Sequence, residues 1–272
     1  MNIVTFLKYL LLGIVQGIAE ILPISSSGHL ALLQQLLQTN PDQEATFAIF
    51  LHFASLVALV IFFWKLILRV IGGFFLFIFK KDARRKDDFW LAVYIVVASI
   101  PAGIVGFLLS DAIEGLFGDL LYVGIGFLVT ATILFLWPLL GSNRDEKYRF
   151  KHIIMAGLFQ VIGILPGISR SGMTITGAKV GGLKETPAKE FAFLLFLPVA
   201  LGSFVFSLGD FETIFASSGP TLVYFLSAMV AAGVFTYLSL LFIFKKFHYN
   251  QAKYFAIYLV ALGVLTIILG VI

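Results

Sequence analysis

The sequence predicts an all-α integral membrane protein with six transmembrane helices and two re-entrant helical hairpins in an inverted-topology repeat. Three observations lead to this fold class. The 272 residues are 60% hydrophobic and 12% charged, whereas soluble domains are about 45 to 50% apolar and about 25% charged. The apolar residues form runs long enough to span a membrane. Lysine and arginine are concentrated on alternate connections between these runs.

The first element is an interrupted apolar region at 3–37, which we interpret as a re-entrant hairpin. Proline, serine and glycine residues cut it in the middle, and a helix formed by its second arm, 28–37, would be only about 15 Å long. The hydrocarbon core of a bilayer is about 30 Å thick, so this arm would enter the membrane without crossing it. The first arm, 3–22, is by contrast long enough to cross.

Six other apolar runs approach the roughly 20 residues that a spanning helix needs. They lie at 45–65, 90–110, 119–141, 187–208, 220–244 and 253–272. Between the third and the fourth run is a second interrupted region, 152–183, whose arms at 152–165 and 172–183 are again too short to cross. We therefore expect three spans after each hairpin.

The positive charges predict the direction of these spans. The segments rich in lysine and arginine are 65–86, 144–151 and 245–253, all on one side of the predicted topology. The connectors on the other side carry neither residue; they are 38–44, 111–119 and 209–219. Because cytoplasmic loops collect lysine and arginine, the basic side is predicted to be cytoplasmic and both termini to lie outside. The net charge of +4 is then explained by membrane flanks, and we expect no nucleic-acid partner.

The two halves have opposite orientation in this topology, and they also align without gaps at a constant offset. The aligned pairs are Gln16 with Gln160, the SSSG of 25–28 with the SRSG of 169–172, and the FA of 47–48 with the FA of 191–192. We expect one membrane domain, 1–272, built from the repeats 1–143 and 144–272. Inverted repeats with broken helices place a binding site near the membrane midplane, where the repeats meet.

Polar residues gather at the break of the first hairpin. Gln16 and Glu20 lie four residues apart, on one helical face, and Pro23 then ends that helix. Serines stand where the next helix would be capped, and a histidine follows them. These residues are Ser25, Ser26, Ser27 and His29.

The second break repeats this plan and adds an arginine. Free N–H groups and the helix dipole make a helix N-terminus an anion site, and the Arg170 guanidinium matches phosphate oxygens. The oxygens of Glu20 and Gln16 suit Mg²⁺ or Ca²⁺, which would bridge a carboxylate to phosphate. The remaining candidate phosphate-binding residues of this break are Ser169, Ser171 and Thr174.

Less specific interpretations apply to several of these residues. Glu20 could be only a structural partner of Arg170, although charged residues inside a membrane are usually functional. His52 stands alone in a span, opposite Phe196 in the repeat, and is predicted to be a packed polar residue. Two glycine pairs, Gly13 with Gly17 and Gly177 with Gly181, predict close helix packing. Three tryptophans near span ends predict an interfacial belt: Trp64, Trp90 and Trp137.

At the two breaks the sequence resembles the undecaprenyl-diphosphate phosphatase family, the bacitracin-resistance phosphatases of bacterial inner membranes. Its glutamate-rich motif corresponds to Gln16 through Glu20, followed by LPISSSGHL, and its second motif corresponds to PGISRSGMT from Pro166. The resemblance covers essentially the whole chain. It implies a multi-pass protein of the bacterial plasma membrane whose active site faces the periplasmic or outer side.

The resemblance implies removal of the terminal phosphate of undecaprenyl diphosphate, with a divalent cation, Mg²⁺ or Ca²⁺. Carried over, the functional residues are Glu20, Ser26, His29 and Arg170, with Gln16 in a more variable position. The attacking group stays open: Ser26 activated by His29, which we prefer, His29 itself, or a water. A transporter of polyprenyl phosphate on the same repeat scaffold is the alternative function. Partners would be the polyprenyl diphosphate and membrane lipids; the sequence leaves a homodimer open.

Overall fold

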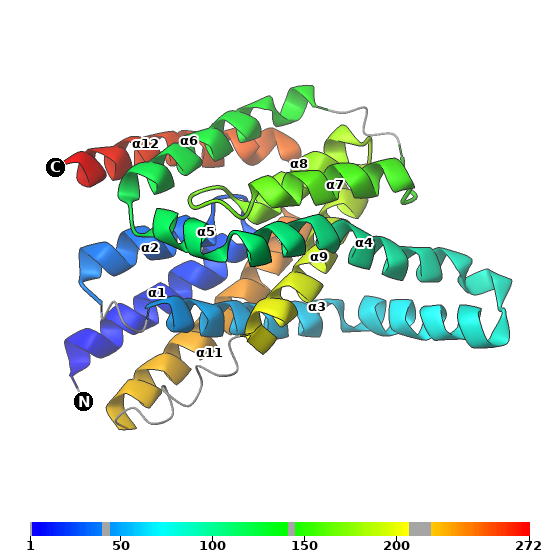
Figure 1. The fold of residues 1–272 in the computed structure, drawn as a ribbon, viewed down its shortest axis with the longest axis horizontal. Coiled ribbons are helices and arrows are strands. Elements are labelled where there is room, and N and C mark those ends of the chain that lie inside the picture. Colours follow the sequence, from blue (N-terminus) through cyan, green and yellow to red (C-terminus); the bar gives the residue numbers. More distant parts are fainter. Residues whose placement is uncertain (1, 40–43, 141–144, 207–218) are drawn as a thin grey trace.

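The protein is almost entirely helical. The structure, a computed structural model, describes residues 2–39, 44–140, 145–206 and 219–272, and these ranges contain one isolated bridge but no β-strand. The α-helices are α1 (Ile3–Ile21), α2 (Ser26–Leu37), α3 (Glu44–Lys80), α4 (Lys86–Leu108), α5 (Ser110–Phe117), α6 (Leu120–Leu136), α7 (Phe150–Ile162), α8 (Arg170–Val180), α9 (Glu185–Phe206), α11 (Gly219–Lys245) and α12 (Ala252–Val271) (Figure 1).

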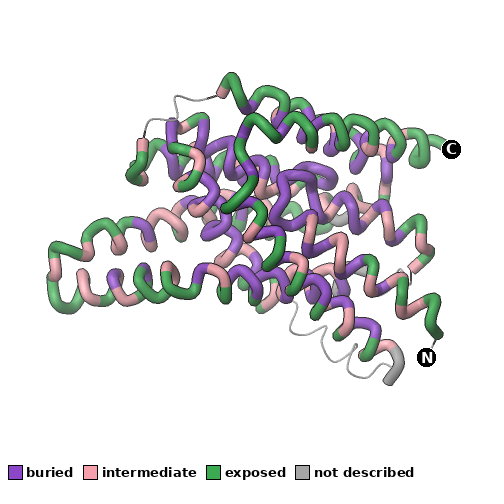
Figure 2. Tube along the Cα trace, turned by 180° about the vertical axis from the view of Figure 1, so that it is seen from behind, coloured by how far each residue is buried: buried purple, intermediate pink, exposed green. Residues whose placement is uncertain are grey.

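Seven helices of the described chain are long and apolar enough to cross a membrane, which confirms an all-α multi-pass membrane protein. Six of them correspond to the predicted runs, and the seventh is α1, with 19 residues. The arrangement of six spans and two hairpins therefore stays a prediction, because α1 qualifies as a span by length. Figure 2 shows buried residues in the centre of the bundle and exposed ones along its outer faces. Phe107 and Leu108, with exposed fractions of 68% and 70%, are among the large apolar side chains there.

The first hairpin is formed by α1 and α2. Pro23 lies directly after α1, and the chain turns back at Ser25, whose φ of 69° is in the left-handed region that disfavours residues with a Cβ. The Ser25 hydroxyl accepts a hydrogen bond from the N–H of Gly28 at 3.3 Å and so caps α2. The predicted capping serine therefore lies at the turn between the two arms and caps the second arm, α2.

The second hairpin, α7 and α8, is built in the same way. The two helices have 13 and 11 residues, too few to cross a core of about 30 Å. Ser169 caps α8 by accepting a hydrogen bond from the N–H of Gly172 at 3.1 Å. Gly167 takes the left-handed position here, with a φ of 73°. Both interrupted regions thus contain a capped helix start in the middle of the bundle.

The predicted cytoplasmic loop 65–86 is largely helical, so this boundary was wrong. α3 continues to Lys80 and has 37 residues, because the sequence remains apolar on both sides of Arg69. It forms a long hairpin with α4 (Figure 1), and the chain reverses through the short 3₁₀ helix Ala83–Arg85. Arg69 Nε lies 3.1 Å from Asp88 Oδ1 across this hairpin. The predicted connector 111–119 likewise contains a helix, α5.

Close packing between glycines and backbone carbonyls joins the first hairpin to the spans. A Cβ placed on Gly13 or Gly17 would lie 2.2 or 2.4 Å from a carbonyl oxygen of α11, so α1 and α11 approach to backbone contact. In the second hairpin a Cβ on Gly177 would lie 2.4 Å from the carbonyl oxygen of Met155 in α7. The predicted close packing at these glycines is confirmed.

The division into two inverted repeats stays a prediction, although several helix pairs of one half have a counterpart pair in the other. Under it, α1 corresponds to α7, α3 to α9, α4 to α11 and α6 to α12. α1 packs on α11, and its counterpart α7 packs on α4; α3 packs on α11, and α9 packs on α4. α6 packs on its own counterpart, α12. Each hairpin is therefore packed against a span of the other half.

Trp137 is not part of an interfacial belt. It is fully buried, its indole N–H donates a hydrogen bond to Thr176 Oγ1 at 2.8 Å, and its ring packs edge-on against Tyr249. Position near the end of a run suggested the interface, but the indole N–H has a partner on α8, which allows burial. Trp64 and Trp90, with exposed fractions of 52% and 42%, do lie on the outer surface.

Asp145 ties the connection before α7 to the start of that helix. Its Oδ2 lies 2.7 Å from Lys151 Nζ and 3.0 Å from His152 Nε2. The hydrogen bond from Lys151, followed by that from His152, lowers the pKa of the Asp145 carboxyl from 3.8 to about 2. A group with a lowered folded pKa stabilises the protein above its unfolded pKa, and this contribution is lost as the pH falls through the folded pKa.

We therefore expect the melting temperature of the Asp145→Asn variant to lie below that of the wild type by a constant amount above pH 3.8, the unfolded value. The difference should shrink as the pH falls toward about 2. Thermal unfolding of both proteins in detergent across this range measures it. A difference that does not change with pH would contradict the assignment.

Candidate active site

Glu20, at the end of α1, is the centre of the site, because hydrogen-bond donors from both hairpins surround its carboxylate. Gln16 Nε2 donates to Oε2 at 2.8 Å, and Ser26 Oγ donates to the same oxygen at 2.5 Å. Arg170 Nη2 donates to Oε1. The Glu20 side chain is only 4% exposed, and a buried carboxylate needs such partners.

Arg170 is the first residue of α8 and crosses from the second hairpin to the first. Its guanidinium forms the ion pair with Glu20 on one side, and its central carbon lies 4.2 Å from the centroid of the Phe196 ring on the other. A cation over an aromatic face is favourable when it is partly desolvated. The Arg170 side chain remains 21% exposed. The guanidinium is thus fixed between two partners and still has free donor positions.

Direct contacts also join the tips of the two hairpins. Ser171 Oγ donates to the carbonyl oxygen of Leu22 at 3.3 Å. Thr130 of α6 accepts a hydrogen bond from the N–H of Ser169 at 3.0 Å and donates to the carbonyl oxygen of Gly167 at 3.2 Å. Ser171 thus joins the two breaks, and Thr130 ties the second break to α6; these contacts satisfy backbone groups that would otherwise be unpaired in the membrane interior.

His29 is held away from Ser26. Its Nδ1 lies 2.7 Å from the carbonyl oxygen of Ser25, and its Nε2 lies 2.7 Å from the hydroxyl of Tyr258 in α12. A carbonyl only accepts, so Nδ1 carries the proton and Nε2 of the neutral ring accepts from Tyr258. Ser26 instead donates to Glu20. These contacts do not support the preference for His29 as the base that activates Ser26.

His52 belongs to the site, which the sequence interpretation missed. Its Nε2 lies 3.3 Å from Glu20 Oε2, and its Nδ1 lies 2.8 Å from the carbonyl oxygen of Ala48. We predicted a packed polar residue because His52 has no polar neighbours in the sequence. The residue aligned with it in the repeat, Phe196, contacts Arg170, so the structure places both members of this pair at the Glu20 and Arg170 ion pair; a lone histidine aligned with a phenylalanine carries no sequence signal of this.

A cavity of about 890 Å³ opens beside the ion pair. α2, the first turns of α3, α5 and the end of α9 form its walls, which places it toward the end of the bundle that contains both termini (Figure 1). Ser27, His52 and Arg170 line it. Glu20 does not; it lies behind them, in a space of about 10 Å³ next to Ser171 and Thr174. The Glu20 carboxylate is therefore separated from the open cavity.

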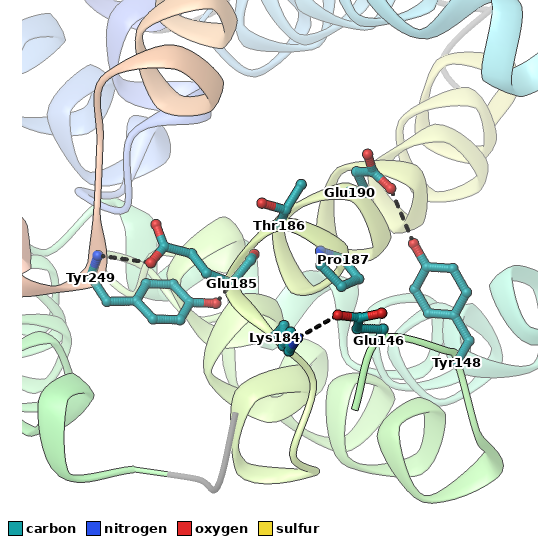
Figure 3. A pocket seen from close by; sticks show the side chains of 8 residues that line it. All are labelled: Glu146, Tyr148, Lys184, Glu185, Thr186, Pro187, Glu190 and Tyr249. Carbon is teal, nitrogen blue, oxygen red and sulfur yellow. Dashed lines mark hydrogen bonds and ion pairs between the residues drawn. The ribbon is translucent and has the colours of Figure 1, made fainter. Parts of the chain in front are cut away.

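A second cavity, of about 690 Å³, lies at the other end of the bundle and contains three glutamates (Figure 3). All three have partners within the protein: Glu190 accepts from the Tyr148 hydroxyl at 3.4 Å, Glu185 from the N–H of Tyr249 at 3.4 Å, and Glu146 pairs with Lys184. The carboxylates thus connect the chain before α7 to α9 and α12. We assign this cavity a structural role.

The residues that could hold a divalent cation are few. Among the described residues, no group of three or more His, Asp or Glu side chains is arranged to bind an ion. Gln16 Oε1, however, is buried without a hydrogen-bond partner, next to the Glu20 carboxylate. Mg²⁺ is commonly held by one or two carboxylates together with substrate phosphates. The donor set therefore fits an ion that binds together with a diphosphate.

The predicted site residues differ in what they contact. Gln16, Glu20, Ser26 and Arg170 meet at one carboxylate, and Ser27 lines the cavity. Ser25 and Ser169 serve as helix caps, and Ser171 joins the two tips. Thr174 donates to carbonyl oxygens of its own helix. Tyr258, the partner of His29, was not anticipated because a tyrosine in an apolar span carries no specific signal.

Known proteins resemble this chain over nearly its whole length. A family model described as bacitracin resistance protein BacA matches residues 9–265. An undecaprenyl-diphosphatase 2 of Bacillus thuringiensis is 37% identical over 267 residues, covering 96% of this chain and 97% of the relative. An undecaprenyl-diphosphatase of Methanosphaera stadtmanae is 38% identical over 277 residues, covering 98% of each. Another, from Oceanobacillus iheyensis, is 37% identical over 273 residues, covering 98% of each.

Proposed function

The chain belongs to the bacitracin resistance protein BacA family, and on this premise we propose that Glu20, Ser26 and Arg170 carry its activity. That activity is the hydrolysis of undecaprenyl diphosphate to undecaprenyl phosphate and phosphate. It recycles the lipid carrier of cell-wall precursors and confers resistance to bacitracin. The observation that supports the site is the 2.5 Å hydrogen bond from the Ser26 hydroxyl to a buried carboxylate that is paired with Arg170.

We also propose an orientation of the protein in the membrane. The basic chain reversal between α3 and α4 is placed in the cytoplasm, and the cavity that contains Arg170 opens to the outer side of the plasma membrane. The absence of lysine and arginine from 38–44 and 111–119, two connectors at the cavity end, supports this orientation. The diphosphate would enter this cavity while the polyprenyl tail remains in lipid.

In the first step Ser26 acts as the nucleophile. Its Oγ forms a bond to the terminal phosphorus, the bond from this phosphorus to the bridging oxygen breaks, and undecaprenyl phosphate leaves. Glu20 Oε2 receives the serine proton and passes it to the departing phosphate. Arg170 stabilises the charge on the transferring group. A 2.5 Å contact already joins the donor and acceptor of this proton.

In the second step a water attacks the phosphoserine. Glu20 takes a proton from this water, the bond from phosphorus to Ser26 Oγ breaks, and the proton returns to the serine. His29 has both ring nitrogens in contact with other groups and would support the turn at Ser25. A divalent cation, held by Glu20 and Gln16 Oε1, would supply further neutralisation of the diphosphate charge.

Phosphate release from a prenyl diphosphate by the purified protein in detergent with Mg²⁺ tests this function. We expect release by the wild type, loss of release with a chelator, and a decrease of about 10³-fold or more for Ser26→Ala, because that variant lacks the attacking oxygen. The His29→Ala variant should form a phosphoserine, which phosphopeptide analysis would detect. Undiminished release by Ser26→Ala would rule out serine as the nucleophile.

The alternative of a polyprenyl-phosphate transporter is not favoured. A transporter would need Arg170 to bind phosphate but no nucleophile, and the relatives are named as diphosphatases. Failure of the wild type to release any phosphate under these conditions would support the transporter.

A further inference from the structure

Two side chains, those of Arg170 and His52, lie between the cavity and Glu20, and each contacts both. Arg170 and His52 each line the 890 Å³ cavity, and each also reaches the Glu20 carboxylate, through Nη2 and Nε2 respectively. Their side chains are 21% and 27% exposed, whereas that of Glu20 is 4% exposed. An anion that enters the cavity therefore meets Arg170 and His52 before it can reach Glu20.

The contacts of His52 fix which of its atoms is available to such an anion. Nδ1 donates to the carbonyl oxygen of Ala48, one turn earlier in α3, at 2.8 Å. This bond holds the ring with Nε2 directed at Glu20 Oε2, 3.3 Å away. A carbonyl and an ionised carboxylate both only accept hydrogen bonds, so Nε2 serves as a donor beside Nδ1 when the ring carries a proton on each nitrogen. A phosphate oxygen is an acceptor of the same kind.

We infer that His52 is a second substrate-binding residue, which works with Arg170 by exchanging Glu20 for the diphosphate. When the substrate enters, its oxygens replace the Glu20 oxygens as acceptors for Arg170 and His52. Glu20 keeps its contact with Ser26, whose proton it accepts in the proposed first step. The resting contacts with Glu20 keep these two partly exposed donors satisfied until the substrate arrives, which avoids the cost of leaving them unpaired. This assignment rests on the proposed function of the site.

The repeat supports a role for this position. His52 and Phe196 are aligned, as are Ser26 and Arg170. Ser26 and Arg170 both donate to Glu20, and Phe196 packs against the Arg170 guanidinium. His52 therefore occupies, in the first repeat, the position that Phe196 occupies in the second, where it packs against Arg170. In the first repeat this position carries a donor instead of an apolar ring.

Two substitutions separate substrate binding from the positioning of Glu20. His52→Gln keeps an amide donor close to the position of Nε2, whereas His52→Asn keeps only a donor close to Nδ1, which can still bond to Ala48. The probe is a prenyl methylenediphosphonate, which binds as a diphosphate but is not hydrolysed. Its dissociation constant is measured by calorimetry with the full-length protein in detergent.

We expect His52→Asn to weaken binding of this probe about tenfold or more, because a hydrogen bond to a charged group is lost. His52→Gln should stay within about threefold of the wild type. His248→Asn is the matched control, since His248 lies at the far end of α11 with a side chain 75% exposed, and its dissociation constant should equal that of the wild type. Melting temperatures verify that each variant is folded.

The outcome that would overturn the inference is an unchanged dissociation constant for His52→Asn together with a lowered kcat, because His52 would then only position Glu20. Parallel assays of phosphate release by the wild type separate the two proposals. Binding of the probe without release would contradict the proposed activity and leave the assignment of His52 standing. Release by the wild type with no binding effect at position 52 would contradict the assignment alone.

Discussion

Glu20→Gln is expected to lower phosphate release by about 10³-fold, since the carboxylate both accepts the Ser26 proton and holds the Arg170 guanidinium. A glutamine has the same shape, but its neutral amide is a weak proton acceptor and offers Arg170 no opposite charge. Initial rates of phosphate release at saturating substrate measure the effect.

Arg170→Lys should lower the rate of phosphate release by about 10²- to 10³-fold, because an ammonium cannot replace the planar fork of donors.

The matched control is Glu190→Gln, in the cavity at the other end of the bundle. Glu190 is bonded to Tyr148 and has no contact with the site, so its variant should retain the rate of the wild type. Melting temperatures of all three variants are needed, because removal of one partner of a buried ion pair also destabilises a protein, by about 3 to 5 kcal/mol. A Glu20→Gln variant that is folded and fully active would exclude the proposed mechanism.

Gly167→Ala is expected to destabilise the protein by more than about 3 kcal/mol and to lower its melting temperature by roughly 5 to 10 °C. Gly167 has a φ of 73°, which an alanine adopts only with strain. A Cβ at this position would also lie 2.0 Å from the carbonyl oxygen of Val123 in α6. The second hairpin would have to move away from α6, and Arg170, three residues later, would move with it.

Gly103→Ala provides the comparison for this variant. Gly103 lies inside α4, and a Cβ there would meet no atom within 4 Å. An alanine in a helix is favoured over glycine by up to about 1 kcal/mol, so this variant should melt at or slightly above the wild-type temperature. Thermal unfolding and phosphate release of the two variants test the pair. Equal stability of Gly167→Ala and Gly103→Ala would contradict the close packing of the second break against α6.

The hairpin breaks and their caps could be predicted from the sequence because they depend on local chemistry. A proline ends α1, and Ser25 and Ser169 accept hydrogen bonds from residues three positions later, a pattern set by neighbours in the chain. The end of α3 was predicted less well. Its membrane-spanning part was recognised, but the helix continues through Gly72 and Gly73 to Lys80, alongside the partner helix α4, to which Arg69 is paired.

The individual contacts of the site were harder to predict. That Glu20 and Arg170, 150 positions apart, would lie at one site was predicted because the two hairpin breaks were expected to meet around a phosphate; their direct pairing was the less specific alternative. The sequence could not predict that Ser26 would contact Glu20 and His29 would contact Tyr258. These choices depend on how far each helix is rotated about its axis, and the packing of α1 on α11 and of α6 on α12 determines that rotation.

From its sequence alone, this chain was determined to be a multi-pass helical membrane protein with two broken helices that carry a carboxylate, an arginine and capping serines within apolar segments. Those features follow from hydrophobic runs and from residues whose effects reach only a few positions along the chain. The tertiary structure decided which donors surround Glu20, that His52 is one of its neighbours, and that Trp137 is buried. The physical reason is that contacts between distant segments depend on the packing of whole helices against one another.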